Sequence, residues 1–165
     1  VYLWVELGLQ TINDETAENF NRGYKFEVFK EGIKKLQDRG IEVVVHSIFG
    51  LPGETKEDML RTIDYIAHSG AQGIKFHLLH LMKNTKMAEQ YYNGEFELLS
   101  EEDYIDLICQ GISMIPEEMV VHRLTGDAPR ATLIGPMWSL KKWEVLNAID
   151  KALVDRDIWQ GKNFK

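Results

Sequence analysis

The stretch IEVVVHSIFGLPGET, residues 41–55, predicts one complete strand-to-helix unit. Its first part, residues 41–49, is rich in valine and almost continuously apolar, which is typical of a parallel strand buried on both faces. The glycine-containing turn at 50–53 lets the chain bend sharply, and Thr55 with Asp58 is a typical start of a helix. This stretch therefore favours an α/β fold with parallel strands.

The same alternation continues on both sides of this stretch. Further strands are expected at residues 1–8, 74–80 and 119–124, and apolar residues at helical spacing follow each strand. The first of these helices is expected to end at Gly40. The second is expected to run from Thr55 to Gly70, the third from Ser100 to Pro116, and the fourth to begin after Ser139. Strand and helix in alternation imply crossover connections and a parallel sheet. Residues 82–99 are the least regular and are expected to form an excursion at one rim.

Composition narrows the class of protein. The chain has 165 residues, of which 44% are hydrophobic and 27% are charged, as expected for a globular domain. No run of about 18 apolar residues is present, so no membrane partner is expected. Cys109 is the single cysteine, which favours a reducing, cytoplasmic compartment. The net charge of −7 disfavours general attraction to nucleic acid, although Lys141, Lys142, Lys162 and Lys165 could form a local basic patch.

Polar residues collect near the C-terminal ends of the expected strands, where parallel α/β sheets bind ligands. They are Glu6 and Gln10, His46 and Ser47, His77 and His80, and His122 and Arg123. A single buried histidine is more often a hydrogen-bonded core residue than a ligand. The pattern across four strands, however, points to a site at this edge of the sheet.

Several short motifs together resemble the radical S-adenosylmethionine (SAM) family. ELGLQT at 6–11, NRGY at 21–24 and HSIFGLPGET at 46–55 are similar to motifs of its Elp3/MiaB/coproporphyrinogen-oxidase-like group, in the same order. HRLTGD at 122–127 and WQGKN at 159–163 resemble a bacterial Elp3-like subgroup without an assigned substrate. The resemblance covers nearly the whole chain. It implies that residues 1–165 are the C-terminal portion of a partial (β/α)6 TIM-like barrel with a C-terminal helical extension.

The resemblance also implies how SAM would bind at the C-terminal ends of the strands. Gln10 and His46 would lie near the ribose, and Glu6, with Gly8 beside it, near the methionine moiety. Ile48 and Gly50 would flank the adenine, and the main chain around Phe76 and Leu78 would contact it. Two positions depart from the family pattern G-x-I-x-G-x-x-E, because His46 replaces the first glycine and Glu54 comes one residue late. Independently of the resemblance, the clustering of Arg123, Asp127 and Arg130 after the fourth strand makes them candidates for substrate contacts, with a conformational or salt-bridge role as the alternative.

The family's C-x-x-x-C-x-x-C loop is absent from this sequence. In the family, three thiolates of that loop hold a [4Fe–4S] cluster, SAM binds its fourth iron, and reduction yields a 5′-deoxyadenosyl radical. Four strands also make only part of a barrel, and a sheet that starts at residue 1 exposes an edge. We therefore expect preceding strands to carry the cysteine loop, and we expect the 165 residues alone to be inactive. The full enzyme would need a flavodoxin- or ferredoxin-type electron donor.

Two other hypotheses stay open at this level. A metal-dependent barrel hydrolase would use His46, His77, His80 and His122, although His77 and His80, three apart on a strand, should point to opposite faces. A noncatalytic domain that docks RNA or another protein is the second. Members of the wider group often modify tRNA, so RNA is also a candidate substrate by analogy.

Overall fold

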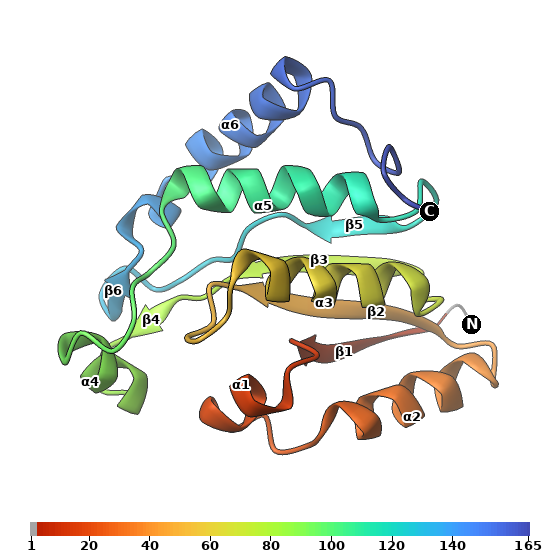
Figure 1. Ribbon diagram of the computed structural model, residues 1–165, viewed down its shortest axis with the longest axis horizontal. Coiled ribbons are helices and arrows are strands. Elements are labelled where there is room, and N and C mark those ends of the chain that lie inside the picture. The colour runs from red at the N-terminus through yellow and green to blue at the C-terminus, as the bar shows by residue number, and fades with distance from the viewer. Residues whose placement is uncertain (1–2) are drawn as a thin grey trace.

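Four parallel strands form the centre of the protein. A computed structural model describes residues 3–165, and Figure 1 shows the strands side by side with their C-terminal ends toward the same edge. The strands are β1 (Trp4–Gln10), β2 (Glu42–Phe49), β3 (Gly73–Leu78) and β5 (Val120–Arg123). They pair in the order β1-β2-β3-β5, and every pairing is parallel. The predicted α/β class and parallel sheet are therefore confirmed, and β1 ends two residues later than predicted.

One long helix follows each strand. These helices are α2 (Phe26–Gln37), α3 (Lys56–His68), α5 (Glu101–Met114) and α6 (Lys142–Asp155). The predicted starts at Thr55 and Ser100 are confirmed as N-caps, each accepting a main-chain N–H with its hydroxyl. Gly40 and Gly70 lie just after the ends of α2 and α3, at φ values of +68° and +75°. Left-handed backbone of this kind favours glycine, which explains where the helices stop.

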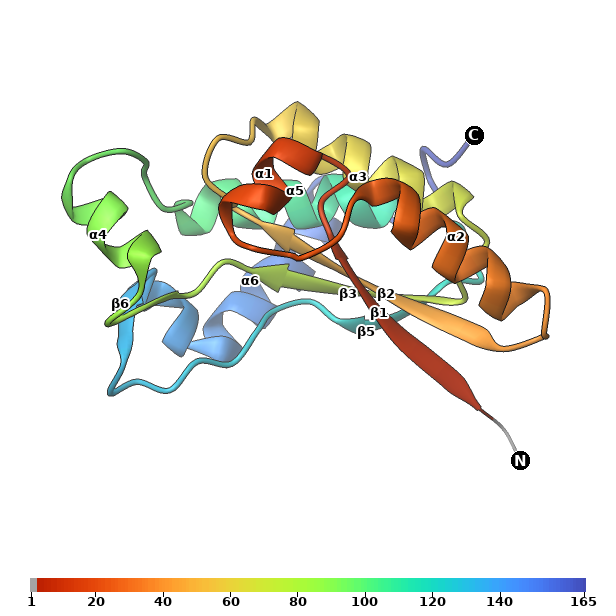
Figure 2. The same cartoon turned by 90° about the horizontal axis from the view of Figure 1, so that it is seen from below.

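The main core lies between the sheet and its helices. Figure 2 shows α1, α2, α3 and α5 on one side of the sheet. Val43 and Val45 of β2 meet Ile63 and Ile66 of α3 in this layer, and all four side chains are fully buried. Burial of apolar surface here supplies most of the stabilisation that ties strands to helices.

The opposite face of the sheet corrects the prediction that the strands are buried on both faces. Along β1 every second side chain points away from the helices, and Trp4 is 47% exposed. Val120 on β5 is 57% exposed. We call this side of the sheet the open face. It is formed by Trp4, Glu6, Gly8, Glu42, Val44, His46, Ile48, Gly73, Lys75, His77, Val120 and His122.

Short elements gather at the C-terminal ends of the strands. The region predicted as an excursion contains α4 (Lys86–Tyr92) and β4 (Leu81–Met82), which pairs antiparallel with β6 (Leu133–Gly135). Helix α1 (Asp14–Asn19) follows β1, and the 3-10 helix η1 (Met137–Leu140) precedes α6. Figure 1 places α1, α4, β4 and β6 at this one end of the molecule. The predicted rim excursion is confirmed, whereas its short helix and strand pair were not predicted. Among residues 3–165, no helix combines the length and the apolar character that crossing a membrane requires.

Candidate functional site

A three-residue network lies on the open face and joins three strands. The carboxylate of Glu6 accepts hydrogen bonds from Lys75 Nζ at 2.6 and 2.7 Å and contacts His46 Nε2 at 2.8 Å. The Lys75 hydrogen bond, with a smaller contribution from His46, lowers the pKa of Glu6 to about 2. Glu6 is therefore ionised at neutral pH and can only accept hydrogen bonds. His46 Nε2 therefore acts as the hydrogen-bond donor to Glu6.

Strand register brings these residues together. Gly8 on β1, His46 on β2 and Lys75 on β3 are lateral neighbours, so their side chains share the open face. Gly8 contributes no side chain, and the side-chain amide of Gln10 occupies that space, donating to the main-chain oxygens of Gly8 and Leu9 at 3.0 Å. A Cβ at position 8 would collide with that amide. Glu6, Gly8, Gln10 and His46 were all predicted from the sequence, and the structure brings them together. Lys75, the strongest partner of Glu6, was not predicted.

His77 extends the network toward the C-terminal end of the sheet. Its ring lies 5.1 Å from that of His46, tilted by 30°. Burial, followed by the nearby charges of His46, Arg123 and Lys75, lowers the pKa of His77 to about 4. The ring is therefore neutral at pH 7. Its Nε2 atom is buried and has no hydrogen-bond partner among the described residues.

His80 approaches the same region, which corrects the prediction that His77 and His80 point to opposite faces. A Cβ built on Gly126 would lie 2.8 Å from His80 Cε1 and 4.0 Å from His77 Nδ1. The alternation of side chains holds only within a strand, and β3 ends at Leu78, before His80. Burial also lowers the pKa of His80, and its Nε2 is buried without a partner in the described part of the chain.

Arg22 gives the NRGY motif a structural role. Its guanidinium donates to the main-chain oxygens of Leu9 at 2.9 Å and Thr11 at 2.5 Å, and to Asp14 at 2.8 Å. The Arg22 side chain is only 2% exposed. Tyr24 adds a hydrogen bond from its hydroxyl to the oxygen of Gly8. The motif therefore holds the C-terminal end of β1, where Gln10 turns back over the open face.

Glu54, the position displaced from the family pattern, binds to the neighbouring loop. It accepts a hydrogen bond from the Thr11 hydroxyl, and its second oxygen is buried without a partner among residues 3–165. Burial raises the pKa of Glu54. This carboxylate joins the loop after β1 to the loop after β2.

The remaining predicted cofactor residues lie toward the C-terminal ends of β2 and β3. Ile48 is half-buried on the open face, and Gly50 follows β2 with φ +87° and donates to the sulfur of Met59 at 3.1 Å. The side chains of Phe76 and Leu78 are buried in the core on the helical side. Only their main chain is available to a ligand on the open face, which is the kind of contact that was predicted.

The predicted substrate residues come together only in part. Arg123 lies 3.8 Å from a carboxylate oxygen of Asp127, and Lys142 contacts both oxygens of Asp127 at 2.9 Å. The hydrogen bond from Lys142 lowers the pKa of Asp127. Arg130 is exposed in the loop before β6 and forms no ion pair with Asp127 among the described residues. Lys142, at the start of α6, was predicted as part of a basic patch and not as a partner of Asp127.

The histidines do not form a metal centre. Residues 3–165 contain no group of three or more histidine, cysteine, aspartate or glutamate side chains placed to hold a metal ion. His46 is hydrogen bonded to Glu6, and His122 packs against Gly73 lower on the sheet. The hydrolase hypothesis therefore has no ligand set in this part of the chain.

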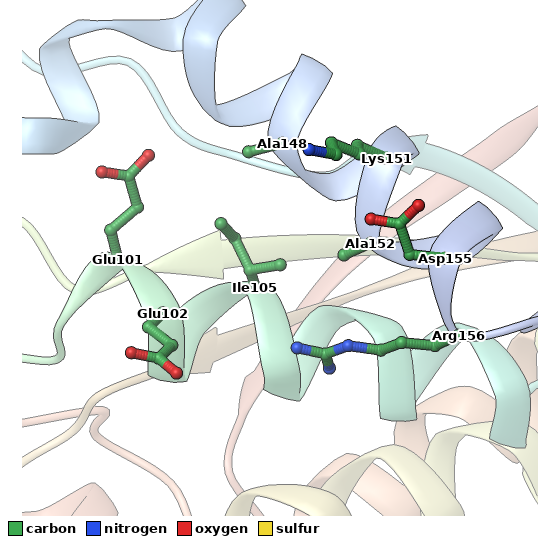
Figure 3. A pocket seen from close by; sticks show the side chains of 8 residues that line it. All are labelled: Glu101, Glu102, Ile105, Ala148, Lys151, Ala152, Asp155 and Arg156. Carbon is green, nitrogen blue, oxygen red and sulfur yellow. The ribbon is translucent and has the colours of Figure 1, made fainter.

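A separate pocket of about 510 Å³ lies between α5 and α6. Figure 3 shows Glu101 and Ile105 on α5 pointing toward α6, which carries Lys151, and Arg156 reaching toward α5. Arg156 forms an ion pair with Asp106 at 2.8 Å, which links the two elements. This pocket belongs to the helical layer, and the network of the open face contributes none of its lining residues.

Comparison with known families decides where this arrangement belongs. The model of the radical SAM C-terminal domain matches residues 71–155, and the model of the radical SAM superfamily matches residues 2–66. The chain belongs to the radical SAM superfamily. The predicted resemblance is therefore confirmed, including its Elp3-like group.

Relatives and a solved structure agree with this assignment. The chain is 51% identical to the uncharacterized protein YtqA of Bacillus subtilis over 99% of its own length and 51% of that protein. It is 34% identical to YhcC of Escherichia coli, over 94% of this chain and 50% of YhcC. The structure of Elp3 from the archaeon Methanocaldococcus infernus, with residues 1–46 deleted, matches with a TM-score of 0.83 and 22% identity, over 96% of this chain and 37% of that one. This radical SAM chain thus spans about half the length of YtqA and YhcC and shares its fold with Elp3.

Proposed function

We propose that the open face binds SAM as part of a radical SAM enzyme. The observation that carries this proposal is the Glu6–His46–Lys75 network, joined by His77, on the open face of a sheet from this family. An ionised carboxylate beside an ammonium group suits a ligand that carries both charges, as the methionine end of SAM does. The unpartnered Nε2 of His77 supplies a further polar group for a ligand.

The residues present fit SAM but not the cluster. SAM would be held by four residues of β1 and β2, namely Glu6, Gly8, Gln10 and His46. Nearer the C-terminal ends of β2 and β3, it would be held by Ile48, Gly50 and the main chain at Phe76 and Leu78. The single cysteine, Cys109, is fully buried in α5 and cannot hold a [4Fe–4S] cluster. When both groups are bound, they supply radical hydrogen-abstraction chemistry to the family.

This chain's own residues would position and shield the ligand. Lys75 keeps Glu6 ionised, so the carboxylate stays an acceptor for an ammonium or hydroxyl group. The hydrogen bond between Glu6 and His46 fixes the orientation of the His46 ring. The Arg22 contacts hold Gln10 and the end of β1 in place beside the ligand.

The substrate side is proposed near Arg123 and Asp127, with Arg130 in the same loop. RNA as a substrate gains little support from the lysines that suggested a basic patch. Lys141, Lys142 and Lys162 are each paired with an acidic side chain, Glu144, Asp127 and Asp157. Paired lysines attract phosphate weakly, because counterion release needs unneutralised charge.

The test is binding of S-adenosylhomocysteine, the unreactive demethylated form of SAM, measured by titration calorimetry on the protein at its natural full length. We expect binding by the wild type and at least about tenfold weaker binding by Glu6→Gln, which removes a charge-assisted contact. Glu144→Gln removes an exposed ion pair on α6 and should bind like the wild type. Absence of binding by the wild type, or equal binding by Glu6→Gln and Glu144→Gln, would contradict the proposal.

An iron assay tests the second half of the proposal. After anaerobic reconstitution, the protein at its natural full length should take up about four irons, and residues 1–165 alone should take up none. Iron bound by the 165 residues alone, or none bound at full length, would argue against the assignment of the cluster.

A further inference from the structure

Another pocket, of about 460 Å³, lies along the outer edge of strand β5. Five consecutive residues, 121–125, line one wall of it, so the pocket follows the edge of the strand and not one face of the sheet. β5 is the last strand in the order β1-β2-β3-β5, and no further strand pairs with this edge in the described part of the chain (Figure 1). Lys142 and Leu146 of α6 form the other wall. The volume is typical of a small-molecule site.

The polar lining of this pocket is basic. Arg123 and Lys142 contribute the charged groups, with the imidazole of His122 beside them, and none of the described residues that line the pocket is acidic. Apart from Thr125, the remaining lining residues are apolar: Val121, Leu124 and Leu146. Helix α6 starts at Lys142 without a side-chain cap, and the N-terminal end of a helix favours negative charge. The lining therefore suits a ligand that combines an anionic group with an apolar part.

Arg123 has the most unused hydrogen-bonding capacity in this pocket. Its guanidinium carries five N–H donors, yet it donates no hydrogen bond among residues 3–165. Its one ion pair in this part of the chain, with Asp127, is long at 3.8 Å. The side chain is 39% exposed and lines the pocket, so a ligand can reach it. Because the donors of a guanidinium match the paired oxygens of a carboxylate or phosphate, such a group is the expected partner.

Asp127 neutralises the neighbouring lysine more than it neutralises Arg123. Both carboxylate oxygens of Asp127 lie 2.9 Å from Lys142 Nζ, whereas the nearest contact with Arg123 is 3.8 Å. Arg123 thus keeps most of its charge. That charge also acts on His77, where it opposes protonation and helps to lower the pKa of the ring. Arg123 is therefore close both to this pocket and to the open face.

We propose that this pocket binds the carboxylate or phosphate group of a small substrate, with Arg123 as the main partner and an apolar part of the same molecule against the apolar wall. The assignment of this molecule as the substrate rests on the proposed function, whereas the anion site itself does not. Asp127 holds Lys142 in place and does not contact the anion favourably. Its own negative charge weakens the binding of the anion.

The test uses three probes that share an aromatic ring, namely benzoate, phenyl phosphate and the neutral benzamide. Dissociation constants are measured by ligand-observed NMR titration of the protein at its natural full length, at constant ionic strength, because salt screens every charge effect. Arg123→Gln removes the proposed partner, and Asp127→Asn removes the nearby negative charge. Their controls, Arg39→Gln after α2 and Asp64→Asn on α3, make the same changes of charge at exposed sites outside the pocket.

We expect the wild type to bind at least one of the two anions about tenfold or more tightly than benzamide. Arg123→Gln should weaken the binding of that anion at least about tenfold, through the loss of a charge-assisted hydrogen bond. Asp127→Asn should strengthen it about threefold or more, because a like charge is removed. Both controls should bind like the wild type. The anion that binds more tightly identifies the recognised group as a carboxylate or a phosphate.

Opposite effects at two neighbouring residues separate binding from folding. A purely structural role would make Arg123→Gln and Asp127→Asn both lose binding in step with their stability, measured in parallel by urea unfolding. Equal binding of benzamide and the anions, binding of neither anion, or equal binding by Arg123→Gln and Arg39→Gln would each overturn the anion site. The titration with S-adenosylhomocysteine tests the SAM site with a different probe, so either proposal can fail while the other stands.

Discussion

The depressed pKa of His77 predicts a specific loss of stability in mild acid. In the unfolded chain a histidine titrates near its ordinary value of 6.5, whereas in the folded protein burial and neighbouring cations lower the pKa to about 4. Between these two values the unfolded state binds a proton that the folded state does not. Stability is therefore complete above pH 6.5 and is lost as the pH falls toward 4.

The size of the effect follows from proton linkage. With pKa values of 6.5 and about 4, full linkage would reduce the free energy of unfolding by about 2 kcal/mol between pH 7 and pH 5, and solvent screening of the half-buried ring brings the expected loss to about 1–2 kcal/mol. The His77→Gln variant cannot titrate, so its stability should fall by about 1–2 kcal/mol less than that of the wild type over the same interval. Urea unfolding followed by circular dichroism at pH 7 and pH 5 measures both differences.

His68 is a matched control with the opposite sign. Hydrogen bonds to the main-chain oxygens of Lys165 and Asp64 raise the pKa of His68. Its contribution is thus present below the unfolded pKa and is lost as the pH rises through the folded pKa. His68→Gln should leave the acid loss unchanged or slightly larger. An acid loss in His77→Gln equal to that of the wild type would refute the burial argument for His77.

Three substitutions test the packing around the site, each by urea unfolding against a matched control. Arg22→Ala removes a buried guanidinium that donates to three main-chain oxygens and to Asp14, and it should cost about 3 kcal/mol. The exposed Arg39→Ala should change stability by less than about 0.5 kcal/mol, and equal costs would contradict the buried role of Arg22. Gly126→Ala places a methyl group 2.8 Å from His80 and should lower the free energy of unfolding by about 1–3 kcal/mol. Its control is Gly32→Ala in α2, where the new methyl group has no atom within 4 Å and should stabilise the protein by about 0.5–1 kcal/mol. No change in stability in Gly126→Ala would show that His80 moves freely. Thr55→Ala removes the cap of α3 and should cost about 1 kcal/mol, with Thr132→Ala in an exposed loop as the control; no difference between them would mean that the cap contributes nothing.

The elements that could be predicted from the sequence are those fixed by local patterns. The apolar run at 41–49 and the capping residues Thr55 and Ser100 depend only on neighbours within one strand or one turn, and the structure confirms them. The short helices α1 and α4 have too few residues for a periodic apolar pattern, although their caps Asn13 and Thr85 are visible in the sequence. The antiparallel pair β4–β6 joins residues about 50 positions apart, which no local pattern reports.

The candidate site was predictable as a location and less so as a set of contacts. Polar residues near strand ends indicated Glu6, His46 and His77, because isolated polar groups in apolar strands are costly unless they serve a site. The role of Lys75 could not be predicted, because a lysine near the middle of a strand looks the same in the sequence as a solvent-exposed residue of an edge strand. Its role follows only from the lateral pairing of β2 with β3, which sets it beside His46 and within reach of Glu6.

The motif residues divide into two kinds once their contacts are known. Arg22 and Glu54 belong to the most recognisable motifs, yet both bind the protein itself, at the loops after β1 and β2. Glu6 and His46 also belong to motifs, but they face the open side of the sheet together with Lys75 and His77, which lie outside the motifs. A buried arginine that donates four hydrogen bonds tolerates few replacements, because no smaller side chain supplies the same donors. Resemblance in such motifs therefore reports in part how the strand ends are held, because Arg22 and Glu54 contact only the protein's own loops and strand ends.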